Sequence, residues 1–134
     1  MRLLYVWDSE YPWDVRTEKV CLSLSQGGHD VFITSRNRRR LPRTESLKEG
    51  VVERLPSEIW PKFDWLSFPV FFNPLWLAHI RRLITRHKIE LVIVRDLPLA
   101  PAALLVAPKR CPVILDMAEN YPAMIADIWT DGRQ

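Results

Sequence analysis

Short apolar runs alternate along the chain with stretches in which apolar residues recur at helical spacing. The apolar runs lie at 3–7, 31–34, 51–55, 91–94 and 112–115. Short runs of this kind, bounded by polar or glycine residues, are typical of strands buried on both faces. Their alternation with helices predicts an α/β fold, a Rossmann-like, doubly wound parallel sheet of about five strands.

Capping signals mark the predicted helices. Asp14 is a good N-cap residue for a helix that ends at the Gly27–Gly28 pair. Asn73 followed by Pro74 predicts the start of a second helix, which runs to about Lys88. Two more helices are expected at 98–107 and from Pro122 onward.

Composition indicates one folded unit. The chain has 134 residues, of which 48% are hydrophobic and 26% charged, with a formal net charge of +3. That length is typical of a single domain, and the apolar content argues against disorder. Cys21 and Cys111 are too few for a disulfide scaffold and stand in no CxxC pair. We therefore expect two buried thiols in a reducing compartment.

No segment predicts a signal peptide or a membrane span. The apolar run after Arg2 ends at Asp8, and no small-residue cleavage site follows it. The longest uncharged runs, 66–78 and 97–108, are shorter than the ~20 residues of a spanning helix, and both contain prolines. We expect a cytoplasmic protein that at most lies peripherally on the inner face of a membrane.

Polar residues follow several of the predicted strands. In an open parallel sheet, ligands bind outside the carboxyl ends of the strands, near the point where strand order reverses. If the order is 3-2-1-4-5, the ends of strands one, four and five form one crevice rich in carboxylates. Chains also turn at polar strand ends, so the cluster is stronger support than any single member. Its members are Asp8, Ser9, Glu10, Arg95, Asp96, Asp116, Glu119 and Asn120.

Arg16 is a second indication of a site. It lies in the first turn of the first predicted helix, where the helix dipole disfavours a cation by up to about 1 kcal/mol. A local rule that is broken without compensation often marks a functional position. Two interpretations stay open: Arg16 holds an anionic ligand, or it pairs with Glu10 or Asp14.

Common catalytic and cofactor motifs are missing from the sequence. It has no GxGxxG after the first strand, no Walker A loop and no GxSxG elbow. His29, His79 and His87 lack metal-ligand spacing, and His29 is expected to be structural. We therefore predict no cofactor and no metal site.

Basic and aromatic residues gather in two stretches. Five arginines fall within 36–43, and an aromatic-rich run at 60–76 leads into a basic helix on which His79, Arg82 and Arg86 form a polar stripe. The loop is either solvated or binds anionic lipid, while core packing explains some of the aromatics. Nucleic acid is not predicted, because no stacking module or recognition helix is evident. The candidate lipid-facing residues are Arg38, Arg39, Arg40, Arg81, Arg82 and Arg86.

Several segments together resemble a known enzyme family. Residues 11–16 (YPWDVR), followed by a helix and by 28–31 (GHDV), resemble the start of a family-4-type glycosyltransferase with the GT-B fold. Residues 72–76 (FNPLW) and 91–100 (LVIVRDLPLA) are similar to the middle of the same N-terminal domain, and 112–122 (PVILDMAENYP) resembles its fifth-strand turn.

The resemblance implies an acceptor-side domain of an enzyme that moves a sugar from a nucleotide-sugar donor to an acceptor. It implies that residues 1–134 form a single N-terminal domain, truncated at its C-terminal end, without the donor-binding domain. Catalysis across a cleft needs both walls, so the chain is expected to be inactive without a donor-binding partner domain or chain. The candidate catalytic residues are Asp96 and Glu119, and the candidate acceptor-binding residues are Asp8, Arg16, Arg95 and Asn120. Ala118 stands where relatives often carry a histidine.

Two other functions compete with this one. The chain could be a non-catalytic module that docks a membrane surface or a protein partner through its aromatic and basic residues, or a small complete enzyme that uses Asp8, Asp96 and Glu119. We also expect a homodimer or poor solubility, because a bare sheet edge beyond the fifth strand favours association. Met124, Ile125, Ile128 and Trp129 are expected to pack on the sheet.

Overall fold

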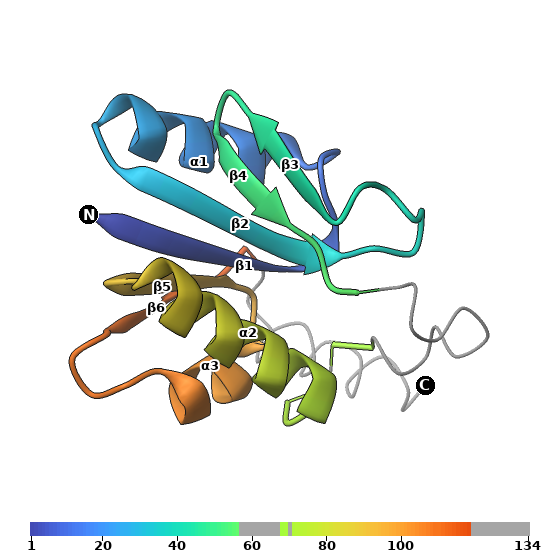
Figure 1. The fold of residues 1–134 in the computed structure, drawn as a ribbon, viewed down its shortest axis with the longest axis vertical. Helices are drawn as coiled ribbons and strands as arrows, with labels where there is room; N and C mark the ends of the chain where they lie inside the picture. Colours follow the sequence, from blue (N-terminus) through green and yellow to red (C-terminus); the bar gives the residue numbers. More distant parts are fainter. Residues whose placement is uncertain (57–67, 70, 119–134) are drawn as a thin grey trace, which may run out of the picture.

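A computed structural model describes residues 1–56, 68–69 and 71–118, in which a mixed sheet lies between helices (Figure 1). Its strands are β1 (Arg2–Glu10), β2 (Asp30–Arg36), β3 (Thr44–Leu47), β4 (Gly50–Glu53), β5 (Leu91–Arg95) and β6 (Val113–Asp116). Its helices are α1 (Val15–Gln26), α2 (Pro74–His87) and α3 (Ala100–Val106). The helix expected from Pro122, and the packing expected of Met124, Ile125, Ile128 and Trp129, lie outside the described residues.

The sheet is wound in two directions from its centre. Its strand order is β3-β4-β2-β1-β5-β6, and every neighbouring pair is parallel except β3 with β4. The five apolar runs of the sequence therefore stand in the order 3-2-1-4-5. The chain passes outward from β1 to β2 and β4, and then returns to the other side of β1 for β5 and β6. The strand order thus reverses between β1 and β5, in an arrangement compatible with a Rossmann-like fold.

Within the described residues the sheet has six strands rather than the expected five or so, because β3 has no apolar run to signal it. Its residues, TESL, alternate between exposed and half-buried positions at the sheet edge. Gly50 follows the turn after β3 and has a φ of +149°. A Cβ there would lie 2.3 Å from the carbonyl oxygen of Val31, so glycine is needed for β4 to reach β2.

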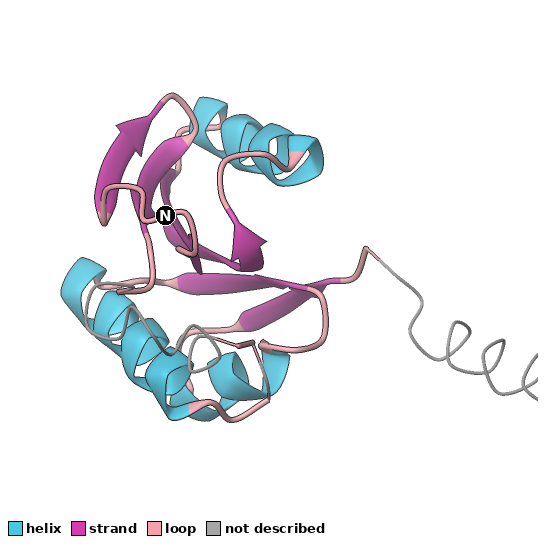
Figure 2. Ribbon diagram, turned by 90° about the vertical axis from the view of Figure 1, so that its right-hand side faces the viewer, coloured by secondary structure: helices cyan, strands magenta, loops and turns pink. Residues whose placement is uncertain are grey.

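Helices lie on both faces of the sheet (Figure 2), and the side chains of each central strand alternate between two cores. Leu4 and Val6 pack with residues of α2 and α3, whereas Tyr5 between them packs with Cys21 of α1. Cys111 belongs to the core on the α2 side, and both cysteines are buried free thiols, as the sequence predicted.

Caps fix where the two long helices begin. The Asp14 side chain accepts a hydrogen bond from the Thr17 amide at 2.7 Å, and Asn73 accepts one from the Leu75 amide at 2.9 Å. Both bonds satisfy amide groups that lack a partner within the helix. The predicted starts of α1 and α2 are thereby confirmed, and Gly27 caps the end of α1.

The polar stripe predicted on α2 is wrong at one position. His79 is only 4% exposed and packs against the sheet rather than facing solvent with Arg82 and Arg86. Its Nε2 forms a 2.9 Å hydrogen bond with the hydroxyl group of Thr34. Burial and, to a smaller degree, the charge of Arg82 lower the pKa of His79 to about 4. A neutral histidine is therefore part of this core.

Within the part of the chain that the structure describes, no helix has the length and apolar character that crossing a membrane would require.

Candidate functional site

Charged side chains meet where β1, β5 and β6 end and α1 begins. Asp8 lies near the end of β1, Arg95 and Asp96 at the end of β5, and Asp116 at the end of β6. The register pairs Arg95 directly with Asp116. We call this group the strand-tip cluster; it consists of Asp8, Asp14, Arg16, Arg95, Asp96 and Asp116. It lies at the reversal of strand order, where parallel sheets bind ligands.

Arg95 is the centre of the strand-tip cluster. It is 8% exposed, and its guanidinium lies 4.2 Å from the centre of the Trp7 ring, in cation–π contact. Its Nη1 donates to the carboxylate of Asp14 and, at 2.6 Å, to the hydroxyl group of Thr17. Burial works to raise the pKa of Asp14, but the hydrogen bonds from Thr17 and Arg95 outweigh it, so that pKa is lowered. Arg95 thereby ties the start of α1 to the end of β5.

One donor of Arg95 remains unused. Its Nε is buried and has no hydrogen-bond partner among the described residues. Arg95 Nε forms an ion pair with Oδ2 of Asp96, but the two atoms are 3.8 Å apart, beyond hydrogen-bond distance. A buried N–H without an acceptor is costly, and such groups are often found where a ligand binds.

Asp96 is held in an uncommon backbone conformation. Its φ of +63° lies in the left-handed region, which aspartate adopts more readily than most residues. Its Oδ1 accepts a hydrogen bond from the Ala118 amide at 2.9 Å, and the residue is 6% exposed. The carboxylate therefore connects the end of β5 to the segment that follows β6.

Asp8 has the most strongly perturbed carboxyl group of the cluster. Burial, followed by the neighbouring negative charge of Asp96, raises its pKa to about 6. The positive charges of Arg95 and Arg36 oppose this shift without cancelling it. A carboxyl group with a pKa near neutrality can both release and accept a proton under physiological conditions.

Arg16 pairs with Asp116, and neither Glu10 nor Asp14 is its partner. Its Nη2 donates to Oδ1 of Asp116 at 2.7 Å, while the other oxygen of Asp116 accepts from the Tyr5 hydroxyl group at 2.9 Å. Of the two interpretations of Arg16, the ion-pair one named the wrong partners, because the carboxylate that Arg16 contacts comes from β6. Half of the Arg16 side chain, 48%, stays exposed.

The structure brings four of the six predicted catalytic and acceptor-binding residues together. Asp8, Arg16, Arg95 and Asp96 belong to the strand-tip cluster. Glu119 and Asn120 lie outside the described residues. The contributions of Trp7, Asp14 and Thr17 were missed, although the N-cap signal at Asp14 already placed that carboxylate at the start of a helix.

A second charged group lies at the end of β4. Arg54 is fully buried, and all three of its guanidinium nitrogens donate hydrogen bonds. Nε and Nη2 donate to the carbonyl group of Tyr11, Nη1 to that of Pro42 at 2.6 Å, and Nη2 also to Glu45 at 2.7 Å. Arg54 thus fastens the loop before α1 and the β3 hairpin to the sheet.

Glu53, beside Arg54, has its own basic partners. His87 Nε2 lies 2.5 Å from Oε1 of Glu53, and nitrogens of Arg86 and Arg82 lie 3.5 and 3.8 Å from Oε2. Two of the predicted lipid-facing arginines are therefore engaged with a buried carboxylate. We call Glu53, Arg54 and these partners the β4-end cluster.

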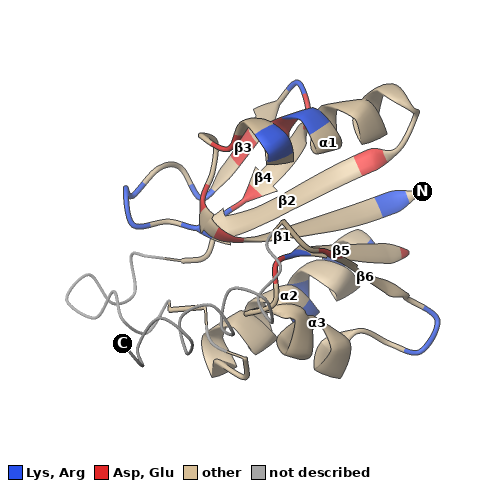
Figure 3. Cartoon of the chain, turned by 180° about the vertical axis from the view of Figure 1, so that it is seen from behind, with Lys and Arg blue, Asp and Glu red and all other residues tan. Residues whose placement is uncertain are grey.

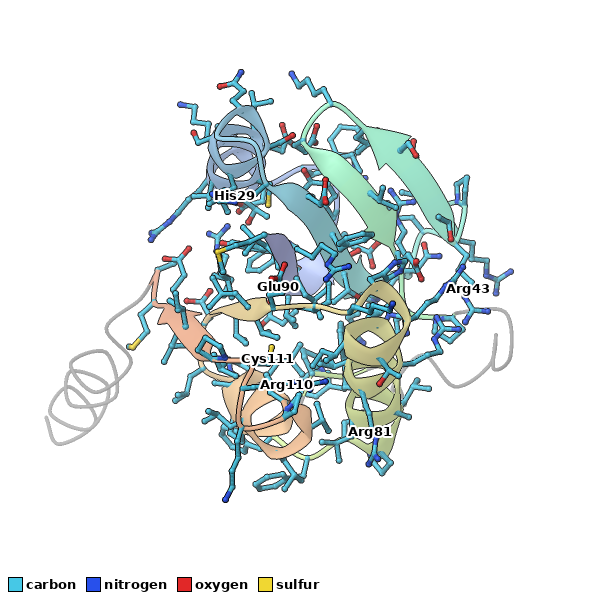
Figure 4. All side chains as sticks on the ribbon, turned by 60° about the vertical axis from the view of Figure 1, so that its left-hand side comes forward. His29, Arg43, Arg81, Glu90, Arg110 and Cys111 are labelled. Carbon is cyan, nitrogen blue, oxygen red and sulfur yellow. The ribbon has the colours of Figure 1, made fainter. Side chains whose placement is uncertain are left out.

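All six predicted lipid-facing arginines are exposed, including Arg82 and Arg86. Arg38, Arg39 and Arg40 lie in the loop between β2 and β3, and Arg81 lies on α2 (Figure 4). Among the described residues, no group of three or more His, Cys, Asp or Glu side chains is placed to hold a metal ion.

A scan against protein-family models, a search of curated proteins and a search of solved structures each found no match to this chain.

Proposed function

We propose that this chain is the acceptor-side half of a glycosyltransferase of the GT-B type, which presents an acceptor hydroxyl group to a sugar activated as a nucleotide-sugar. The observation that carries the proposal is the strand-tip cluster at the reversal of strand order. The resemblance of residues 11–16 and 112–122 to glycosyltransferases supports the reaction class. The binding of a polar ligand is also supported by the unused Nε–H of Arg95.

The residues of the cluster suit a polyhydroxylated acceptor. Ionised carboxylates accept hydrogen bonds from hydroxyl groups, and arginine donates to ring and hydroxyl oxygens. In the reaction, the acceptor oxygen bonds to the anomeric carbon while the bond from that carbon to the diphosphate oxygen breaks. The proton of the acceptor hydroxyl group passes to a carboxylate. We assign the role of proton acceptor to Asp96. Asp8, the second carboxylate, is assigned to binding the acceptor.

The donor is proposed to bind elsewhere. Sugar transfer requires donor and acceptor to be held together in reactive geometry. We propose that a donor-binding partner domain or chain supplies the nucleotide-sugar and that this chain by itself transfers none. The sugar and the acceptor are left open by the proposal.

The proposal is tested by titrating the ¹⁵N-labelled chain with free saccharides and, separately, with UDP-glucose and GDP-mannose while recording amide NMR shifts. Saturable shifts at Asp8, Asp96 and Ala118 with a saccharide, and none with either nucleotide-sugar, are expected. Asp96→Asn keeps an acceptor for the Ala118 amide and tolerates the positive φ, so it should fold while binding saccharide more weakly.

Asp30→Asn is the matched control, because Asp30 is exposed at the opposite end of the sheet, where β2 begins. Its titration should match that of the unchanged chain. Saturable nucleotide-sugar binding at the strand-tip cluster, or no saccharide response there at any concentration, would contradict the proposed function.

A further inference from the structure

Large aromatic side chains are exposed beside the basic loop between β2 and β3. Trp13 is 68% exposed, and the phenylalanines before α2 are between 52% and 61% exposed. Soluble proteins rarely leave several such rings uncovered in one place without a function. We call this group the aromatic–basic surface; it consists of Trp13, Arg39, Arg40, Phe68, Phe71 and Phe72.

Contacts join the loop and its flanking residue Arg36 to two of the exposed rings. The Arg39 guanidinium lies 5.2 Å from the centre of the Trp13 ring, and that of Arg36 lies 5.5 Å from the centre of the Phe68 ring. The Asn73 side chain donates to the carbonyl group of Phe68 at 2.9 Å and so ties it to the start of α2. Residues 36–40 therefore contact Trp13 through Arg39 and Phe68 through Arg36, and Phe71 and Phe72 follow Phe68 closely in the chain.

The loop has a defined conformation. The Asn37 side chain donates to the Leu41 carbonyl group and accepts from the Leu41 amide, both at 2.8 Å. The Arg38 amide donates to Oε1 of Glu10 at 2.6 Å. These bonds hold the turn in place, so Arg39 and Arg40 are presented to solvent without a large ordering cost on binding.

We propose that the aromatic–basic surface docks onto an anionic lipid membrane. Indole and phenyl rings lie favourably at the boundary between headgroups and acyl chains, and arginines pair with lipid phosphates. The exposed phenyl rings of Phe71 and Phe72 gain free energy by leaving water for the apolar part of a lipid surface. Their positive neighbours complement the negative surface potential of the membrane. The inference does not depend on the proposed function.

Vesicle co-sedimentation tests the charged half of this surface. The chain should bind vesicles of phosphatidylcholine with added phosphatidylserine, bind phosphatidylcholine alone far less, and be released by salt. The double variant Arg39→Gln, Arg40→Gln should bind the anionic vesicles roughly 30-fold more weakly. The control Lys109→Gln, Arg110→Gln removes the same charge at the opposite end of the molecule and should bind normally (Figure 3).

A second pair of variants tests the aromatic half. Phe71→Ser with Phe72→Ser should weaken vesicle binding by about tenfold, because the rings no longer enter the lipid. Leu104→Ser with Leu105→Ser, on the exposed side of α3, is the matched control and should bind normally. Circular dichroism and thermal melting of each variant separate loss of folding from loss of binding.

Three outcomes would overturn the inference. One is equal weakening by both charge variants, which would indicate attraction by net charge alone. Another is vesicle binding that is unaffected by the phenylalanine variants. The last is saturable binding of single-stranded RNA under conditions in which the anionic vesicles are not bound, which would assign the surface to nucleic acid.

Discussion

The strand-tip cluster and the β4-end cluster differ in how completely their buried charges are paired. In the β4-end cluster, every guanidinium nitrogen of Arg54 donates a hydrogen bond, and Glu53 has three basic partners. In the strand-tip cluster, the Arg95 Nε–H has no acceptor among the described residues, and Asp8 has a raised pKa. Buried charges with complete hydrogen bonding are typical of groups that stabilise a fold. Buried charges with an unsatisfied donor or a shifted pKa are typical of ligand-binding sites.

The largest effect is expected from Arg54→Met. The substitution leaves the carbonyl groups of Tyr11 and Pro42 without a donor and Glu45 without its partner. Breaking a buried charge network in this way costs about 3–5 kcal/mol of unfolding free energy. Urea denaturation measures the loss, with Arg40→Met in the exposed loop as the control that should stay within about 0.5 kcal/mol. A loss below about 1 kcal/mol would show that Arg54 is not a structural clamp.

The next largest effect concerns His79 on the α2 side of the sheet. Its pKa is about 4 in the folded chain, below its ordinary value of 6.5, so the unfolded chain binds the proton more readily. The effect of His79 on the free energy of unfolding is constant above pH 6.5. It lowers that free energy as the pH drops toward 4, by roughly 2–3 kcal/mol in total.

Replacing His79 with Gln tests this pH dependence, because Gln cannot titrate and can still reach the Thr34 hydroxyl group. The urea midpoint of the variant should fall less between pH 6.5 and 4 than that of the unchanged chain. Identical pH profiles for the two proteins would show that His79 is protonated as easily in the folded as in the unfolded state.

Asp8 is expected to change stability in the opposite direction. Its pKa is raised from 3.8 to about 6, so the folded chain binds the proton more readily than the unfolded one. The cost of ionising Asp8 is absent below pH 4, grows as the pH rises to 6, and is complete above it. Because Asp8 keeps some access to solvent, we expect Asp8→Asn to gain only about 1–2 kcal/mol at pH 7.5. The gain should vanish at pH 4, and a gain that persists there would assign it to another cause.

The sequence could predict the members of the strand-tip cluster that come from strand ends, because apolar runs show where strands end and parallel strands end at one edge. Asp8, Arg95 and Asp96 were placed there for that reason. It could not predict that Arg16 pairs with Asp116, since the two are 100 positions apart and meet only through the position of β6. Helical caps were predicted better because each depends on neighbours within three residues.

Helical spacing also explains the error at His79. The spacing shows which residues share a side of α2, but not what that side packs against. Here it packs against β2 and β4, where Thr34 and the Glu53 carbonyl group offer polar partners to a buried imidazole. A strand such as β3, short and polar, is likewise defined by its pairing with β4 rather than by its own pattern.

The smallest effect on stability is expected from Arg16→Gln. The ion pair with Asp116 is short, but half of the Arg16 side chain is in water, and Asp116 keeps its bond from Tyr5. Exposed pairs of this kind contribute less than about 1 kcal/mol. Urea denaturation measures the change, with Arg2→Gln, which breaks the exposed pair with Glu90 at the other end of the sheet, as the control.

Arg16→Gln also separates the two kinds of cluster from each other. If Arg16 binds a ligand, the variant should match Arg2→Gln in its urea midpoint while losing the saccharide-induced NMR shifts at Asp8 and Asp96. A destabilisation comparable to that of Arg54→Met would place Arg16 among the structural charges instead. Unchanged saccharide shifts would leave Arg95 as the arginine of the site, because its buried Nε–H is the donor that still lacks an acceptor among the described residues.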